Sequence, residues 1–399
     1  MLPVDRMVAQ KAKAMTRIEV LKKAQEGRIT WQQAAQICRM TARHLRRLRQ
    51  RLGLLGPDGL RDGRAGRAMP HVIAQDTLEK ICLLKREQYL DFSIRHFHQF
   101  LTERHGIRVG YTATRELLQA QGLAEKAPGR GKYRRRRERR PMRGMLMHLD
   151  ASTHPWIAGL PDHDLVVALD DADGRILYAR FFEQEGTVST LHALEHVLRR
   201  WGRFCELYTD GGSHFCTTGE AGQGPNAEQH TQVIRALRVL GIRHIVARSP
   251  EARGRSERCF GTIQGRLPQE LRLAGIDNYA AANRYLEKTF VPDFNRRFTV
   301  QPQQPESAFV SVTGLDLELL LSVQHGRVVQ KDNTVSFNRL VLQLPPQPDR
   351  PHLVRCPVLV HELLDGTLAV SFQGRLVARF TADGTPPAAA TRKPARRAA

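Results

Sequence analysis

The stretch MLMHLD, residues 145–150, is a short apolar run that ends in a carboxylate. A run of this length between polar flanks is typical of a buried β-strand. Two further segments, 165–169 and 176–182, have the same strand-like composition, and the turn sequence DDADG at 170–174 joins them as a hairpin. We therefore predict that a β-sheet begins at residue 145 with three consecutive strands.

Helix and strand signals alternate after this hairpin. An amphipathic helix is expected over 187–202 and a strand over 206–209. The remaining elements expected are a helix at 228–240, a strand at 242–247 and a helix at 250–273. This order predicts a mixed sheet covered by helices, which places the segment in the α/β class.

Three acidic residues fall at informative places in this pattern. Asp150 ends the first strand, Asp210 follows the fourth strand, and Glu257 lies in the last helix. A carboxylate at a strand end is poorly placed for a core. Three carboxylates that converge at a sheet edge form an oxygen-rich site that suits two divalent ions. Asp210 alone precedes two glycines and is more typical of a turn, so the prediction rests on the three residues together.

The amino-acid composition argues against a disordered, membrane-spanning or secreted protein. The chain has 399 residues and a formal net charge of +22, from 62 Lys and Arg against 40 Asp and Glu. Its 41% of hydrophobic residues is enough for several cores, which excludes wholesale disorder. No apolar run reaches the roughly 18 residues that cross a bilayer, and we expect neither a membrane partner nor a secretory signal. The six cysteines lie far apart without metal-binding spacing, as is typical of a cytoplasmic protein.

The positive charge is concentrated in three segments. Residues 39–51 hold six arginines and no acid, residues 126–143 hold ten Lys or Arg and one Glu, and residues 390–399 hold four more. Together these segments carry +19 of the net +22. A polyanion is therefore the expected partner, although charge alone does not separate DNA from RNA or an anionic lipid.

The first basic cluster fits a DNA-binding helix. Helices are expected at 16–25 and 30–38, and Thr41 is a good cap for a third helix over 43–52. Two short helices joined by a tight turn, with a cationic second helix, form the helix-turn-helix pattern. An ordinary Arg-rich surface helix is the alternative, but the cluster has no acid to pair with its arginines. The candidate DNA contacts are Arg43, Arg46, Arg47 and Arg49.

A second helical block leads into the basic linker. Periodicity over residues 76–123 predicts three more helices, the last capped by Thr112, and hence a second helix-turn-helix. The run at 126–143 is of a kind that usually forms a solvated linker. Because DNA-binding segments precede it, we expect a linker that also follows phosphates. Its candidate contacts are Arg134, Arg135, Arg136 and Arg137.

The C-terminal part has a different pattern. Between 325 and 380, short strands recur at regular spacing, with hairpin turns at Asp365-Gly366 and Gln373-Gly374. A small β-barrel is the predicted fold of this segment. The tail at 381–399 is rich in Pro, Ala and Arg and is expected to be disordered.

Four motifs give the α/β region a family resemblance. In chain order they are LDAST at 149–153, VVALDDADGRI at 166–176, YTDGGSHF at 208–215 and SPEARGRSERCF at 249–260. They resemble the landmarks of DDE transposases, whose catalytic core has a retroviral-integrase-type ribonuclease H fold. With helix-turn-helix segments in front and a small barrel behind, the arrangement is similar to bacterial insertion-sequence transposases, including the ISNCY-like group.

The resemblance implies a multidomain chain. The implied parts are a helix-turn-helix domain at 1–60, a second one at 75–125, a basic linker at 126–143, a ribonuclease H-like catalytic core at 144–300, a small β-barrel at 325–380 and a disordered basic tail at 381–399. It also implies that Asp150, Asp210 and Glu257 are the catalytic triad and bind two Mg²⁺ ions, with Mn²⁺ as a substitute. Asp170 and Asp171 correspond to a hairpin acid that the family uses structurally.

The implied function is that of a DNA transposase. The helix-turn-helix domains would bind the terminal inverted repeats of the element, and the core would hydrolyse a strand and join its 3′-hydroxyl to target DNA. A homo-oligomer on double-stranded DNA, associated with the nucleoid in the cytoplasm, is implied as well. Two alternatives are a nuclease of the same fold that cleaves without joining, and a non-catalytic DNA-binding regulator derived from a transposase.

Two features depart from the family pattern. The interval from Asp210 to Glu257 is 47 residues, longer than in many relatives, and the Gly-rich insertion at 216–227 accounts for the excess. Relatives often have Lys or Arg seven residues after the glutamate, where this chain has Gln264, so an amide replaces a charged DNA contact. The other candidate DNA contacts around Glu257 are Arg253, Arg255 and Arg258.

Overall fold

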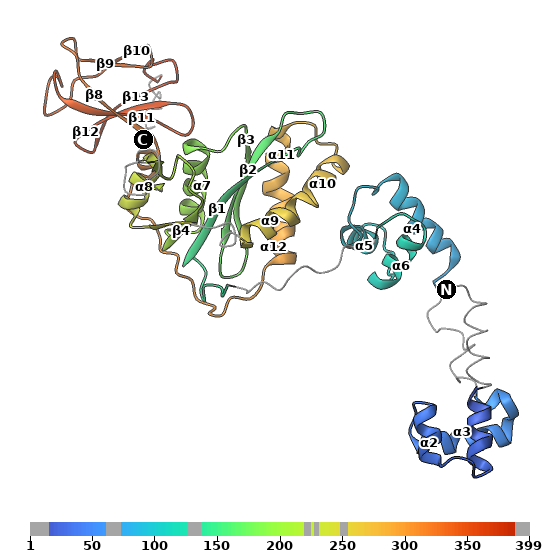
Figure 1. The fold of residues 1–399 in the computed structure, drawn as a ribbon. Helices are drawn as coiled ribbons and strands as arrows, with labels where there is room; N and C mark the ends of the chain where they lie inside the picture. The colour runs from blue at the N-terminus through green and yellow to red at the C-terminus, as the bar shows by residue number, and fades with distance from the viewer. Residues whose placement is uncertain are drawn as a thin grey trace, which may run out of the picture. The chain divides into compact units, whose positions relative to one another are not determined.

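The computed structural model describes residues 16–60, 73–125, 137–218, 225–226, 231–247 and 254–387. Several predicted positions lie outside these residues, namely Arg134, Arg135, Arg136, Arg253, part of the insertion at 216–227 and the tail from residue 388. The chain divides into two compact units, residues 1–79 and 80–399, and each is described by itself (Figure 1). No described helix has both the length and the apolar character needed to cross a membrane.

The first unit has the predicted helix-turn-helix. Residues 16–25 are helical, and α2 (Trp31–Ile37) and α3 (Ala42–Leu55) follow, with the 3₁₀ helix η1 at Gly56–Leu60. Thr41 caps α3, as predicted, because its hydroxyl accepts a 3.3 Å bond from the amide of His44. Leu45 and Leu48 of α3 are buried in a small core, and the arginines between them are exposed.

The three predicted helices of the second block are also present. They are α4 (Gln75–Glu87), α5 (Ile94–Glu103) and α6 (Tyr111–Ala120). Their core is largely aromatic and aliphatic, with Phe97, Leu101 and Leu118 fully buried. Helix α6 begins one residue before the predicted cap Thr112, because Gly110 occupies the N-cap position.

A buried lysine fixes the turn between α4 and α5. The Lys85 side chain is only 2% exposed. Its ammonium donates to the backbone carbonyls of Tyr89, Leu90 and Phe92 at 2.7, 2.8 and 2.7 Å. Burial lowers the pKa of Lys85, and an ammonium that is buried without partners is strongly unfavourable. The three bonds offset that burial and hold the turn in one conformation.

The central sheet confirms the predicted mixed topology. Its strands are β1 (Leu146–His154), β2 (His163–Asp170), β3 (Ile176–Phe182), β4 (Glu206–Thr209) and β7 (Arg243–Val246), in the order β3-β2-β1-β4-β7. Strand β2 is antiparallel to both of its neighbours, whereas β4 is parallel to β1 and β7 is parallel to β4. The antiparallel second strand and the parallel strands β1, β4 and β7 together make this a mixed sheet.

Helices cover both faces of this sheet (Figure 1). On one face α7 (Thr187–Arg200) and α8 (Gln232–Leu240) pack against Met147 and Leu149 of β1. The other face meets α9 (Gly254–Gln264), α10 (Leu267–Leu273), α11 (Tyr279–Tyr285) and α12 (Val291–Phe298). The single helix predicted at 250–273 is therefore two helices, because the chain breaks at Gly265 and Arg266 and Pro268 opens α10.

Polar contacts join the α4–α6 helices to the core. Glu103 of α5 forms a two-pronged ion pair with Arg297 of α12, with both bonds at 2.7 Å. The buried imidazole of His96 lies 3.0 Å from a carboxylate oxygen of Glu270 in α10. The second helical block is thus packed on the helical layer α10–α12 by its helix α5.

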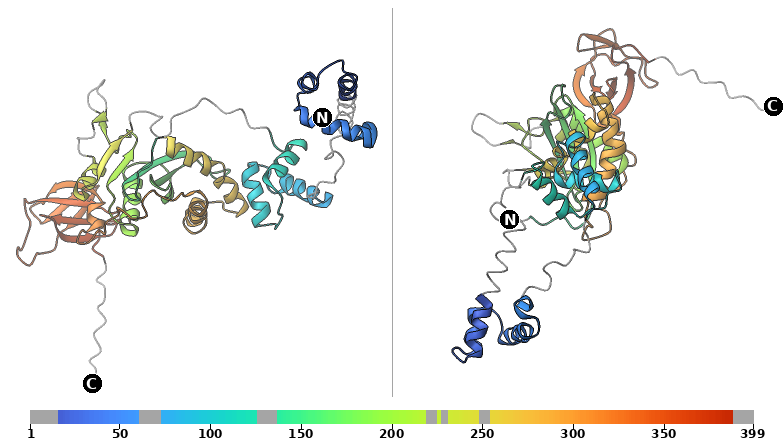
Figure 2. Two further views of the ribbon diagram at one scale, coloured as in Figure 1. Left: turned by 90° about the horizontal axis from the view of Figure 1, so that it is seen from below. Right: turned by 90° about the vertical axis from the view of Figure 1, so that its right-hand side faces the viewer.

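The C-terminal strands form two open sheets (Figure 2). After α13 (Leu317–Leu320) come β8 (Val323–Val328), β9 (Thr334–Phe337), β10 (Leu340–Gln343), β11 (Pro357–Glu362), β12 (Leu368–Phe372) and β13 (Arg375–Phe380). One sheet has the order β13-β12-β11-β8 and the other the order β10-β9, and the two share one apolar core. The predicted barrel is not formed, because β8 and β13 are the edges of the larger sheet and β9 and β10 pair with each other.

Replacing Lys85 by Met tests the role of the buried ammonium. We expect Lys85→Met to destabilise the α4–α6 helices by about 2–3 kcal/mol, because three backbone carbonyls, two of them buried, lose their donor. Hydrogen exchange of the α4 and α5 amides in the full-length chain measures the effect. The exposed Lys80 on the same helix supplies the matched control, Lys80→Met. Equal protection in the two variants would contradict the prediction.

Candidate active site

Asp150 and Asp210 belong to neighbouring strands of the sheet or lie directly after them. Asp150 is the fifth of the nine residues of β1, so it does not end the strand as predicted, whereas Asp210 directly follows β4. In the parallel pairing of β1 with β4, Met147 lies opposite Leu207 and His148 opposite Tyr208. Extended two residues, past the last residue of β4, this register would set Asp210 level with Asp150, and level residues of parallel strands face the same side.

Helix α9 lies over this face beside Asp150. Asp150 is 8% exposed and lines a small cavity together with Ser256 and Cys259 of α9. Its backbone neighbour Ala151 donates a 3.0 Å bond to the carboxylate. Burial raises the pKa of Cys259 to about 12, and the negative charge of Asp150 adds to the shift. Helix α9 is thus close enough to Asp150 for the carboxylate charge to raise the pKa of Cys259.

Glu257 belongs to the first turn of α9 but faces outward. Ser256 and Cys259 are buried, whereas Glu257 is exposed. Within the described residues, no three His, Cys, Asp or Glu side chains are gathered closely enough to hold a metal ion. Carboxylate oxygens are nevertheless the ligands that Mg²⁺ prefers. The donor types of the three acids fit a magnesium site, but the described conformation does not gather them into one.

A tight loop holds the second acid. The amide of Gly212 donates to Asp210 Oδ1 at 2.9 Å. A Cβ atom at Gly212 would lie 3.0 Å from His214 Cε1 and 3.1 Å from Asp210 Oδ1, so a larger residue would press on both side chains. His214 in turn lies 3.6 Å from Glu185. The predicted turn after β4 is therefore also the support of the carboxylate.

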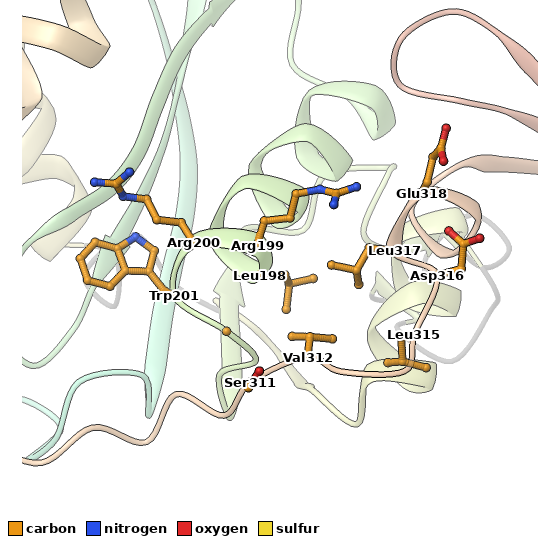
Figure 3. A pocket seen from close by; sticks show the side chains of 11 residues that line it. Leu198, Arg199, Arg200, Trp201, Ser311, Val312, Leu315, Asp316, Leu317 and Glu318 are labelled. Atoms are coloured by element: carbon orange, nitrogen blue, oxygen red, sulfur yellow. The ribbon is translucent and has the colours of Figure 1, made fainter. Parts of the chain in front are cut away.

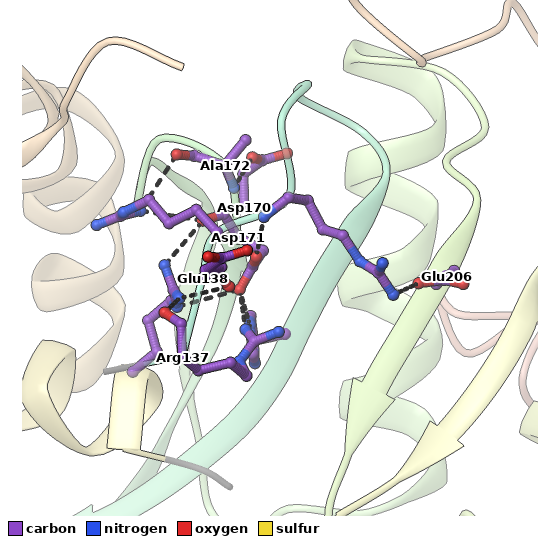
Figure 4. Close-up of polar contacts among 10 residues, drawn as sticks. Arg137, Glu138, Asp170, Asp171, Ala172 and Glu206 are labelled. Carbon is purple, nitrogen blue, oxygen red and sulfur yellow. Dashed lines mark hydrogen bonds and ion pairs between the residues drawn. The ribbon is translucent and has the colours of Figure 1, made fainter. Parts of the chain in front are cut away.

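Asp171 was interpreted from the sequence as part of a hairpin turn, yet it is the most heavily bonded carboxylate near the site (Figure 4). Its side chain is 0% exposed and contacts the guanidinium of Arg137. His148 Nε2 lies 2.7 Å from it, the Arg140 amide donates at 2.7 Å, and Arg255 Nε lies 3.1 Å away. Burial alone would raise the pKa of Asp171, but the bonds from His148 and Arg140 and the charge of Arg255 hold it below its usual range.

Asp170, the preceding residue, has the opposite electrostatic behaviour. It is buried and accepts bonds from the amides of Gly144 and Ala172 at 2.8 and 2.9 Å. Burial raises the pKa of Asp170 to about 6, although both bonds act to lower it. The two neighbouring acids of the turn therefore titrate in different pH ranges, because the bonds and charges around Asp171 outweigh its burial and those around Asp170 do not.

Known proteins with similar sequences show the family of the chain. A helix-turn-helix domain family matches residues 16–68. A Sinorhizobium fredii protein named "Putative transposase y4bF" is 30% identical over 371 residues, which cover 92% of this chain and 80% of that protein. The Streptococcus pneumoniae "Transposase for insertion sequence IS1202" is 27% identical over 317 residues, 70% of this chain and 67% of that protein. The chain belongs to the insertion-sequence transposases.

Solved structures show weaker similarity to this transposase. The trimeric form of the HTLV-2 integrase catalytic core domain in complex with magnesium is 17% identical and covers 36% of this chain and 82% of its own, with a TM-score of 0.28. A simian T-cell lymphotropic virus intasome in complex with PP2A regulatory subunit B56 gamma is 14% identical and covers 72% and 96%, with a TM-score of 0.32. These similarities are too low to bear on the reaction.

The described end of the transposase's basic linker is docked on the core. Arg139 donates to the carbonyl of Asp171 at 3.0 Å. Arg140 pairs with Glu206 of β4 at 2.7 Å, and Arg143 lies 3.4 Å from Asp173 (Figure 4). Sequence reasoning assigned the whole run to phosphates and missed these pairs, because their acids are 30 or more residues away along the chain. The described arginines therefore neutralise acids of the core.

The other predicted DNA contacts have varied surroundings. Arg43, Arg46, Arg47 and Arg49 are all exposed on α3, and the Arg49 guanidinium lies 5.2 Å from the ring centre of Trp31. Arg258 is exposed beside Glu257. Gln264 donates a 2.9 Å bond to Ser152 Oγ, which ties the end of α9 to β1 two residues after Asp150.

A hollow at the end of α7 is away from these acids (Figure 3). It has a volume of about 650 Å³ and is lined by the end of α7 and the segment before α13. Arg199 and Arg200 from α7 and Asp316 and Glu318 from the segment contribute opposite charges to its wall. None of the predicted catalytic residues lines it, so it is separate from the candidate active site.

Asp170 predicts a specific pH dependence of stability. Its folded pKa of about 6 lies above its ordinary value of 3.8, so its contribution is fully present below about pH 4 and is lost as the pH rises through 6. We expect the difference in unfolding free energy between wild type and Asp170→Asn to fall by about 2–3 kcal/mol from pH 4 to pH 7. Urea unfolding of both proteins across this range measures it. A difference that stays constant with pH would exclude the titration of Asp170.

Proposed function

We propose that this transposase is a DDE enzyme that cleaves the ends of its own insertion sequence and joins them to target DNA. The observation that supports the proposal is the parallel pairing of β1 with β4, whose register, extended two residues, would bring Asp210 level with Asp150 next to α9. Glu257 lies in the first turn of that helix. In the proposed site, three carboxylates from a strand, a strand end and a helix would approach one face of the sheet.

These carboxylates would hold two Mg²⁺ ions, with Mn²⁺ as a substitute. The bound ions supply the Lewis acidity that activates an attacking oxygen and stabilises the leaving one in phosphodiester displacement. The chain's own residues bring the acids together and shield them. Asp150 is nearly buried beneath α9, and Asp210 is held by the Gly212 amide. The exposed Glu257 would complete the site from the solvent side, where the DNA strand arrives.

The N-terminal unit would recognise the inverted repeats. Helix α3 presents its arginines to solvent around a buried leucine stripe, which is the arrangement of a helix that enters the major groove. Arginine reads guanine edges and binds phosphates in that groove. Stacking of Arg49 on Trp31 would orient one guanidinium before DNA arrives. The linker arginines Arg134 to Arg137 would then follow the backbone toward the core.

The remaining contacts are proposed around the catalytic helix. Arg253 and Arg258 would bind phosphates next to Glu257, and Gln264 would approach the same strand with its amide. Pairing of two element ends requires at least two copies of the chain on double-stranded DNA, so we propose a homo-oligomer that assembles on its substrate, in the nucleoid. The second helical block at 75–125 would extend the recognised site.

Glu257→Gln tests the catalytic assignment. The amide keeps the size of the side chain but removes the charge of a metal ligand, so we expect end cleavage to fall by at least about 10³-fold with unchanged affinity for the element ends. Single-turnover cleavage of an end duplex in Mg²⁺, together with fluorescence anisotropy, measures both. Glu287→Gln changes an exposed glutamate of the same core and should leave both values as in wild type. A fully active Glu257→Gln would disprove the assignment.

Arg46→Ala and Arg47→Ala test the recognition helix. If each residue contacts one phosphate, each variant should lower the salt slope of log K against log salt by about 0.9. Arg28→Ala, which removes an exposed arginine of the same unit that pairs with Glu26, is the matched control. Anisotropy titrations of the end duplex at several salt concentrations measure the slopes. Equal slopes in all three variants and in the wild type would show that Arg46 and Arg47 do not contact DNA phosphates.

A further inference from the structure

Three separate segments meet at the carboxylate of Asp171. The turn between β2 and β3 contributes Asp171 itself, the end of the linker contributes Arg137 and the amide of Arg140, and α9 contributes Arg255. Figure 4 shows the linker and the turn converging there. A buried carboxylate is strongly unfavourable unless it is paired. The segments that supply its partners are therefore held together.

Arg255 connects this cluster to the catalytic helix. Its Nε lies 3.1 Å from Asp171 Oδ1, its Nη1 donates to the Asp171 carbonyl at 3.1 Å, and its Nη2 donates to the Arg137 carbonyl at 3.2 Å. The side chain is only 15% exposed. A planar guanidinium whose Nε, Nη1 and Nη2 all have partners is held in a single orientation. Because Arg255 is the second residue of α9 and Glu257 the fourth, this contact fixes the turn that carries Glu257.

His148 connects the same carboxylate to the first catalytic strand. Its Nε2 lies 2.7 Å from Asp171 Oδ1, and its ring packs against Tyr208 of β4 at 5.1 Å. His148 and Asp150 are two residues apart on one strand, so they face the same side of the sheet. Asp171 thus bonds to the residue two before Asp150 and to the residue two before Glu257.

The first turn of α9 has particular need of such a contact. The first amides of a helix lack partners within the helix and fray when nothing restrains them. Gly254 begins α9 and has no side chain that can hold the start of the helix against the core. Gln264 ties the far end of α9 to Ser152, and Arg255 does the same at the beginning. The helix is therefore held against the sheet at both ends.

We propose that Asp171 and Arg255 are a positioning pair that sets the approach of Glu257 to Asp150. The proposal rests on the proposed function, and it assigns neither residue a chemical step. It gives Arg255 a role inside the protein in place of the DNA contact expected from the sequence, since its donors are directed at Asp171 and at two backbone carbonyls. A displacement of about 1 Å at a reacting group can lower a rate by about 10²-fold.

The test compares Arg255→Ala, Arg255→Lys and Arg258→Ala in the full-length chain. Hydrogen exchange of the α9 amides, without DNA or metal, reports on the turn directly. We expect Arg255→Ala to exchange about tenfold faster in the first turn of α9, with Arg258→Ala as in wild type. Arg255→Lys, which can keep one of the bonds, should fall between them.

Cleavage and binding assays separate positioning from DNA contact. Arg255→Ala should lower the single-turnover rate by about 10²-fold and raise the Mg²⁺ concentration for half-maximal rate, with unchanged affinity for the end duplex. Arg258→Ala should instead weaken DNA binding and reduce its salt dependence. Unchanged exchange in Arg255→Ala, or weaker DNA binding with an unchanged Mg²⁺ requirement, would overturn the positioning role.

Asp171→Asn tests the other residue of the positioning pair. The amide keeps the shape and one acceptor, and we expect faster exchange in the same turn. Combined with Arg255→Ala, it should add less than its separate effect, because both changes break one interaction. Strictly additive effects would show that the two residues act independently. Absence of cleavage by the wild-type chain would refute the proposed function alone, since the exchange measurements stand without it.

Discussion

The pairing of β1 with strands on both sides is the constraint on which the catalytic region depends. β1 is antiparallel to β2 and parallel to β4, and both pairings pass through His148. Alternation along the strand then divides its side chains between two helical layers. Met147 and Leu149 enter the apolar core beneath α7 and α8, whereas His148 and Asp150 face α9. A strand in the middle of a sheet thus exposes two polar side chains to a buried layer, and that layer must supply partners for them.

The partners come from charges that are distant in sequence. The carboxylate of Asp171 bonds to His148. Arginines from the linker and from α9 pair with that carboxylate and balance its charge. Arg140 and Arg143 do the same for Glu206 and Asp173 at the rim of the sheet. Part of the positive charge that precedes the core is therefore needed by the core itself. The excess of +9 in residues 126–143 serves the stability of the fold as well as any attraction for DNA.

Local patterns were sufficient for the elements of the central sheet. Period-two and helical spacing predicted its five strands, although the first strand continues past Asp150 to His154, because residues 151–154, although mostly polar, pair with β2. Local patterns could not show which elements pair at long range. His96 and Glu270, which hold α5 on α10, are 174 residues apart, and neither position has a pattern that refers to the other.

The predicted barrel of the C-terminal strands was wrong for a related reason. Regular strand spacing is common to barrels and to open sheets, and closure depends on whether the first and last strands pair. Strand β8 starts at Val323 in a stretch that contains Gln324, His325 and Gly326, which lacks the alternation of an ordinary strand. It pairs with β11, so its register was decided by its neighbour and not by its own side chains.

The two arginines that meet Asp171 differ in what they can do when DNA is bound. The Arg137 side chain is 46% exposed, whereas that of Arg255 is 15% exposed. A phosphate can therefore compete for Arg137 from the solvent side without entering the buried cluster. Asp171 would keep its bonds to His148, the Arg140 amide and Arg255 after such an exchange. The linker can thus bind DNA at its outer arginine while the contact that holds α9 remains intact, which allows substrate binding and active-site geometry to coexist in one cluster.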